Sequence, residues 1–149
     1  MLISGQGHVV GPGDGRIVDL GVARMRVLAA GQDITRGAFT LAEFSGGLGP
    51  WTVPHLHRGM EESFFVLDGE FAFTVGDQEH TAGPDSFVLV PRDTPHVFAA
   101  TTEHARCLVL MVPGGQEEMF YELSGLGADS IRDPAVRAAI SARYDSVPV

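Results

Sequence analysis

The sequence contains very little cysteine. Cys107 is the only one among 149 residues, so an internal disulfide is excluded, and this fits a reducing compartment. Cys107 lies in the apolar run of residues 107–112, where we expect a small buried side chain rather than a reactive thiol. A chain of this length buries roughly two thirds of its unfolded surface, so one domain can fold without disulfide support.

Positive charge is also scarce. The 10 Lys and Arg residues stand against 19 Asp and Glu residues, which gives a formal net charge of −9 at pH 7. Proteins that bind nucleic acid or anionic membranes need surfaces rich in Lys and Arg, so the composition argues against both. We therefore expect neither nucleic acid nor a membrane as partner.

Long hydrophobic runs are missing too. No segment approaches the roughly 18 apolar residues that a transmembrane helix requires. Residues 1–7 lack both a basic stretch and a long apolar core, so they do not have the pattern of a signal peptide. These features together predict a cytoplasmic protein.

Short apolar segments separated by Gly, Pro and Asp make up most of the chain, which is typical of short β-strands. Asp68-Gly69 lies between two such segments and is the strongest signal for a two-residue hairpin. Many short strands at regular spacing predict an all-β sandwich or barrel. The expected strands are residues 16–20, 22–30, 36–44 (alternating around Phe39, Leu41 and Glu43), 53–57, 62–67, 70–75, 78–82, 86–90, 95–100 and 105–112.

Two helices are expected after the strands, because the Pro-Gly-Gly at 113–115 ends the β region. The first covers residues 116–123, with its acidic side chains, Glu117 among them, facing water. The second begins with Asp133 as N-cap and Pro134 at the first helical position. We expect one domain over residues 1–149, with a barrel core at about 35–113 and a helical extension at about 116–145.

Histidines and a glutamate form the clearest functional pattern. His55 and His57 are two residues apart, so an extended segment directs both side chains to one face. Glu62 follows a short bend, across which the chain can fold back and bring its carboxylate to the same point. Imidazole nitrogens and a carboxylate together suit zinc, iron, nickel, copper or manganese.

The spacing of these residues resembles the first motif of the cupin superfamily. That motif is a glycine, five residues, His-x-His, three or four residues, a glutamate, six residues and a glycine. The matching residues are Gly49, His55, His57, Glu62 and Gly69.

The second cupin motif resembles the stretch from Gly83 to His96, with two departures. Asp93 stands where the family has a turn glycine, and Asp accepts turn and left-handed conformations better than most residues. Ala100 stands in place of an asparagine that is often a supporting residue rather than a ligand. The resemblance implies one divalent transition-metal ion (Fe, Ni, Mn, Cu or Zn) held by His55, His57, Glu62 and His96.

The resemblance also implies a fold and an assembly. Cupins are double-stranded β-helix (jelly-roll) barrels, and they commonly form homodimers through outer sheet faces. Residues 61–70 and 90–98, with the C-terminal helices, are similar to bacterial single-domain cupins of the quercetin dioxygenase type. In that group Glu62 would be both a weak ligand and the general base that takes the proton of a substrate hydroxyl.

Strand alternation indicates which side chains line the pocket. An inward Glu62 implies an inward Phe64, and an inward His96 implies an inward Phe98. Trp51 precedes the ligand strand, near the expected barrel mouth, where it could wall a substrate or cover a dimer interface. The candidate pocket residues are Trp51, Phe64, Phe73 and Phe98. An apolar barrel with one polar end suits a small aromatic or hydrocarbon-rich ligand.

Three functions remain open for such a site. The first is a metal-dependent dioxygenase that acts on a small aromatic, enolic or flavonol-like substrate. The second is a non-oxidative cyclase or isomerase of the polyketide type, in which a Lewis-acid metal polarises a carbonyl. The third is a non-enzymatic cupin that binds a small ligand. The identity of the ion and the need for oxygen separate the first two.

Overall fold

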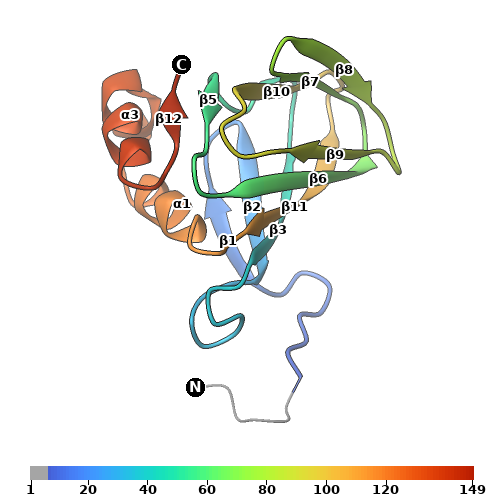
Figure 1. The fold of residues 1–149 in the computed structure, drawn as a ribbon. Helices are drawn as coiled ribbons and strands as arrows, with labels where there is room; N and C mark the ends of the chain where they lie inside the picture. Colours follow the sequence, from blue (N-terminus) through green and yellow to red (C-terminus); the bar gives the residue numbers. More distant parts are fainter. Residues whose placement is uncertain (1–6) are drawn as a thin grey trace.

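The computed structural model describes residues 7–149, in which two antiparallel β-sheets face each other and helices lie at one side of the barrel (Figure 1). Residues 1–6, where we expect no signal peptide, lie outside the described part. The first sheet has the order β1 (Arg16–Asp19), β2 (Ala23–Ala29), β3 (Thr40–Gly46), β11 (Ala105–Val112), β6 (Glu61–Asp68) and β9 (Phe87–Val90). The second has the order β12 (Val147–Pro148), β5 (His55–Leu56), β10 (His96–Ala100), β7 (Phe71–Val75) and β8 (Gln78–Ala82), with β4 (Gly49–Pro50) also paired to β10. This is the all-β jelly-roll barrel that the sequence predicts.

The core lies between the two sheets, because every second residue of each strand points inward. Phe64 and Val66 on β6 are fully buried, and Phe71 and Phe73 on the opposite sheet face them. Cys107 on β11 is also fully buried, and burial raises the pKa of its thiol to about 12. The expectation of a small buried side chain at Cys107 is therefore confirmed.

The strand expected at residues 36–44 is partly wrong. Residues 36–39 are not in a strand, and Arg36 has a left-handed backbone with φ of 55°. The strand begins only at Thr40, and its buried face is formed by Thr40, Ala42 and Phe44. Leu41 and Glu43 therefore point outward, while Phe39 precedes the strand. The predicted alternation therefore holds from residue 40 onward, with Leu41 and Glu43 on the outer face of the sheet.

The backbone conformation of two turns explains why Gly69 and Asp93 occupy them. Gly69 has φ of 71°, and a Cβ atom at this position would lie 2.2 Å from the carbonyl oxygen of His104. Only glycine fits this hairpin turn. Asp93 has φ of 59°, so it adopts the left-handed turn that a glycine would otherwise take. Its N–H donates to the carbonyl oxygen of His57 at 2.7 Å, which ties the two ligand-bearing segments together.

The C-terminal segment forms α1 (Glu117–Ser124), α2 (Ala128–Arg132) and α3 (Pro134–Ala142), of which α2 was not expected from the sequence. Asp133 caps α3 as expected, because its carboxylate accepts a hydrogen bond from the N–H of Ala135 at 2.9 Å. Glu117 does not face water. It is buried and accepts a hydrogen bond from Thr40 on β3, which fastens α1 to the barrel. None of the helices in residues 7–149 has the length and hydrophobicity of a membrane span.

Candidate metal centre

The two sheets bring the four predicted ligands together. His55 lies on β5 and pairs directly with His96 on β10, while Glu62 comes from β6 in the opposite sheet. His57 follows β5 immediately. The candidate ligand atoms of these four residues all lie within 4.8 Å of one another, and all four residues are buried. Glu61 points the other way and pairs with Arg92.

Backbone carbonyls fix the orientation of all three imidazole rings. Nδ1 of His55 lies 2.7 Å from the carbonyl oxygen of Val53, and Nδ1 of His96 lies 2.9 Å from that of Thr94. Nδ1 of His57 lies 2.7 Å from the carbonyl oxygen of Asp145. A carbonyl oxygen can only accept, so each Nδ1 carries the proton. In the neutral imidazole the lone pair is then on Nε2.

The inward-facing atoms suit a cation. Oε2 of Glu62 lies 3.1 Å from Nε2 of His57 and 3.2 Å from Nε2 of His96. A carboxylate oxygen and two neutral Nε2 atoms are all acceptors, so a positive charge is needed between them. Ligands about 2.1 Å from one ion at right angles are separated by about 3 Å, which is close to these spacings. The four residues therefore fit a divalent transition metal.

Without an ion, protons supply this positive charge. Burial opposes protonation of His57, but the hydrogen bond and charge of Glu62 outweigh it and raise the His57 pKa. Burial also opposes ionisation of Glu62, but hydrogen bonds from His57 and His96 lower its pKa to about 2. Burial, followed by the charge of His96, lowers the His55 pKa to about 4. Protons and metal ions therefore compete for these nitrogens.

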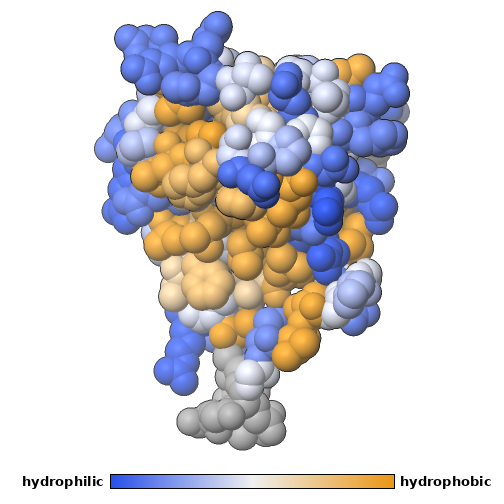
Figure 2. Space-filling model, turned by 90° about the vertical axis from the view of Figure 1, so that its right-hand side faces the viewer, coloured by the Kyte–Doolittle hydropathy of each residue, from blue (hydrophilic) through white to orange (hydrophobic). Residues whose placement is uncertain are grey.

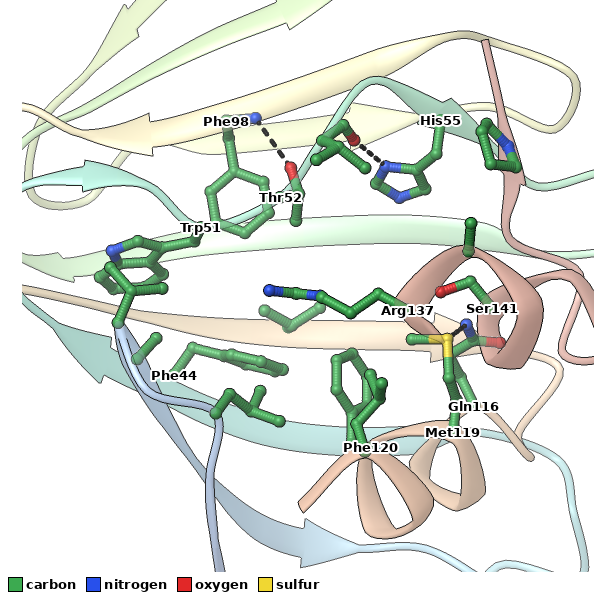
Figure 3. A pocket seen from close by; sticks show the side chains of 18 of the residues that line it. Phe44, Trp51, Thr52, His55, Phe98, Gln116, Met119, Phe120, Arg137 and Ser141 are labelled. Atoms are coloured by element: carbon green, nitrogen blue, oxygen red, sulfur yellow. Dashed lines mark hydrogen bonds between the residues drawn. The ribbon is translucent and has the colours of Figure 1, made fainter. Parts of the chain in front are cut away.

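A cavity of about 470 Å³ opens from this cluster towards the C-terminal helices (Figure 3). The barrel contributes mainly apolar walls, including Phe44, Trp51 and Phe98. The helices supply Met119 and Phe120 from α1 and Arg137 from α3. Cavities of this size bind small organic ligands, and the helical extension completes the wall.

The predicted pocket residues divide into two pairs. Trp51 and Phe98 line the cavity, and their rings pack edge to face with centroids 6.0 Å apart. Phe64 and Phe73 do not line it. They are 0% and 1% exposed and pack on each other in the barrel core. The alternation rule correctly placed both on an inward face but could not distinguish a packed core from a cavity wall.

Some residues of the site could not be found from the sequence. Asp145 touches the ligand segment from near the end of the chain. Arg137 and Ser141 line the cavity from α3. The only sequence signal was the four-residue spacing of Arg137 and Ser141, which indicates a shared helix face but not what that face contacts.

In a comparison with known families, residues 45–113 match the family described as "Cupin domain". The matched segment includes all four candidate ligands, His55, His57, Glu62 and His96. It ends just after β11 and before α1, so the helices that complete the cavity wall lie outside it.

Two curated proteins are similar to this chain in sequence. Quercetin 2,3-dioxygenase of Bacillus subtilis (strain 168) is 29% identical over 116 residues, which cover 78% of this chain and 34% of that protein. The enzyme of the same name from Aspergillus japonicus is 29% identical over 108 residues, covering 66% of this chain and 30% of that protein. This chain thus spans about a third of the length of these curated relatives. Among solved structures, KdgF from Halomonas sp. matches with a TM-score of 0.61 at 15% identity, covering 69% of this chain and 90% of that chain, which shows a shared fold.

Proposed function

We propose that this chain, which belongs to the cupin superfamily, is a metal-dependent dioxygenase that acts on a small aromatic or enolic, flavonol-like substrate. The observation that carries the proposal is that three of the four clustered candidate ligands, His55, His57 and Glu62, line a largely apolar cavity. Four protein ligands leave one or two positions open on a five- or six-coordinate ion, as catalytic sites require. The similarity to two quercetin 2,3-dioxygenases supports oxidative chemistry.

Glu62 has one oxygen available for proton transfer. Both imidazole contacts go to Oε2, and within residues 7–149 no hydrogen bond to Oε1 is formed. Glu62 also lines the cavity, so Oε1 can meet a bound substrate. The carboxylate is ionised in the metal-free site, and only the ionised form can accept a proton. We assign Glu62 as the base that removes the proton of a substrate hydroxyl.

The other residues of the site hold the ion, orient its ligands and form the walls around the substrate. A redox-active ion held by the three histidines and Glu62 would supply the electron transfer that lets an electron-rich substrate react with dioxygen. Carbonyl groups of Val53, Asp145 and Thr94 hold the imidazole rings in one tautomer. Trp51 and Phe98 offer aromatic surfaces to a planar substrate and exclude water.

Oxygen uptake tests the proposal. Metal-free protein would be loaded separately with Fe(II), Ni(II), Mn(II), Cu(II) or Zn(II) and given quercetin or 3-hydroxyflavone as probe. We expect equimolar loss of oxygen and probe with at least one redox-active ion and none with zinc, and ¹⁸O₂ should label the product with both oxygen atoms. Turnover without oxygen would contradict the proposal and favour a non-oxidative cyclase or isomerase. Binding without any turnover would favour a ligand-binding cupin.

We also propose that the protein is a homodimer. Figure 2 shows a broad hydrophobic area on one face of the molecule. On the outward side of the first sheet, Phe65 on β6 lies opposite Phe87 on β9, and Leu89 and Leu110 flank Ser63 one step along. The exposed fractions of Phe87 and Leu89 are 63% and 51%. This stripe contains no charged side chain, so two copies can meet through it about a two-fold axis without bringing like charges together.

A further inference from the structure

Helix α3 has two different faces. Val136 and Ile140, with Tyr144 just after the helix, pack with Met119 and Leu123 of α1 and hold the helix in place. A second face carries Pro134, Arg137, Ala138 and Ser141, and these residues line the cavity. The first face therefore docks α3 against α1. The second face directs the charge of Arg137 and the hydroxyl of Ser141 towards a largely apolar cavity.

Within residues 7–149, no side chain pairs with the charge of Arg137. Its side chain extends from α3 into the cavity towards Thr52 and Phe44 (Figure 3). Arg143, at the end of the same helix, pairs with Glu122, and Arg26 pairs with Glu43. No carboxylate among the described residues lies within ion-pair distance of the Arg137 guanidinium.

The described cavity wall also offers no free carboxylate that could pair with the Arg137 guanidinium. Among the described residues that line the cavity, Glu62 is the only acidic one, and both of its contacts are to the histidine cluster. Arg137 is half-buried, and a partly desolvated charge without a counterion lowers stability. In a chain with net charge −9, such a cation is most simply explained by a ligand that supplies the missing negative charge.

We propose that the substrate carries a carboxylate that pairs with Arg137 while its enol or phenol end faces the His55, His57, Glu62 and His96 cluster. The metal-facing half of this proposal rests on the proposed function. A guanidinium binds a carboxylate through two parallel N–H bonds, which fixes orientation as well as adding affinity. The Ser141 hydroxyl, one helical turn after Arg137 on the same cavity wall, can donate a further hydrogen bond.

A carboxylate fits this site better than a phosphate. Arg132 also lines the cavity, but it is exposed, so water screens its charge. One partly buried guanidinium then faces the ligand, which matches a monoanion rather than a phosphate dianion. Arg137 is thus a specificity-determining residue that selects acidic aromatic or enolic substrates over their neutral analogues.

Matched probe pairs test this assignment in binding. The first pair is 5-hydroxy-4-pyrone-2-carboxylate and its methyl ester, and the second is 3-hydroxyflavone-4′-carboxylate and its methyl ester. Calorimetric titration would measure Kd for each probe with zinc-loaded and metal-free protein. We expect one of the carboxylates to bind wild-type protein at least about tenfold more tightly than its ester, because a charge-assisted pair is lost in the ester.

Three variants test whether Arg137 causes the preference for the carboxylate over the ester. Arg137→Gln should abolish the preference for the carboxylate while ester affinity and zinc content stay at wild-type level. Arg24→Gln removes the same charge from an exposed position on β2 outside this cavity and should keep the preference. Arg137→Lys should retain only part of it, because the planar fork is lost.

The outcomes separate this inference from the metal-dependent function. Equal affinity for carboxylate and ester in both pairs, including no measurable binding of either, contradicts the role of Arg137. So does a preference that survives in Arg137→Gln. If zinc fails to bind or does not improve the binding of any probe, the metal-dependent function fails instead, and the carboxylate preference is still measured on the metal-free protein.

Discussion

The carbonyl oxygen of Asp145 accepts a hydrogen bond from Nδ1 of His57 at 2.7 Å, across 88 residues of sequence. The Asp145 carboxylate also accepts from the N–H groups of Arg58 and Gly59, each at 2.8 Å. Asp145, which follows α3, therefore holds residues 57–59 through both its backbone carbonyl and its side chain. Because α3 lines the cavity, the same segment connects the cavity wall to the metal centre.

Removing the Asp145 carboxylate should loosen His57 and weaken metal binding. Asp145 has φ of 58°, so Asp145→Gly keeps the backbone conformation and the carbonyl while it deletes the side chain. We expect zinc affinity to fall by roughly tenfold or more, as for other groups that orient metal ligands. Competition with a chromophoric chelator would measure this.

Two further variants control for backbone effects. Asp145→Asn retains one acceptor oxygen and should lie between wild type and Asp145→Gly. Asp85 is exposed and also left-handed, with φ of 69°, so Asp85→Gly tests the same change away from the site. Equal zinc affinity in wild type and Asp145→Gly would show that the carboxylate does not position His57.

Glu62→Gln should separate metal binding from proton transfer. The amide can still offer an oxygen to the ion but cannot act as a base, so we expect metal to be retained and kcat to fall about 100-fold or more. Glu61→Gln changes the neighbouring carboxylate, which points away and pairs with Arg92, and should stay near wild type. Unchanged turnover in Glu62→Gln would remove Glu62 from the role of base.

Acidification should destabilise the metal-free protein in two steps. The folded His55 pKa is about 4, so between pH 6.5 and 4 the unfolded chain binds a proton at His55 that the folded protein does not. Stability is then lost as pH falls, by up to about 3 kcal/mol. The Glu62 pKa is lowered to about 2, so its stabilisation, present above pH 4.5, is lost as pH falls towards 2. His57 acts in the opposite sense, because its stabilisation is lost only as pH rises through its raised pKa.

Urea unfolding in the presence of a chelator would measure this pH dependence. His55→Gln should flatten the curve between pH 6.5 and 4, whereas His80→Gln, at an exposed position on β8, should leave it unchanged. A wild-type curve that is flat over this interval would contradict the environment assigned to His55.

A charge introduced on the outer face of the first sheet should dissociate the proposed dimer into monomers. Leu89→Glu places a carboxylate in the apolar stripe, and a two-fold interface would bring two such charges together. Leu48→Glu is a matched control, because Leu48 is similarly exposed, at 57%, but lies in the turn between β3 and β4. Sedimentation velocity should show a dimer for wild type and Leu48→Glu and a monomer for Leu89→Glu. A monomeric wild type would refute the dimer.

The sequence predicted most of the barrel because its strands alternate clearly and its turns use Gly69 and Asp93. It also identified His55, His57, Glu62 and His96, because the motif spacing of those residues reflects how two paired sheets meet at one end of the barrel. These predictions depend on local patterns, which strands and turns determine strongly.

What the sequence did not predict depends on contacts between distant segments. Glu117 resembles a surface residue, but it is buried against Thr40 because α1 docks there. Phe64 and Phe98 follow the same inward alternation, yet of the two only Phe98 borders the cavity. The roles of Arg137 and Asp145 depend on where the helical extension folds back on the barrel, and no local pattern contains that information.

The metal content of the purified protein tests the central claim most directly. Elemental analysis of wild type after dialysis should find one transition-metal ion per chain. His96→Ala should lose the ion while its circular dichroism stays that of a folded barrel, and His80→Ala should keep it. Metal bound equally well by wild type and His96→Ala, or none bound by wild type after loading with each candidate ion, would contradict the account.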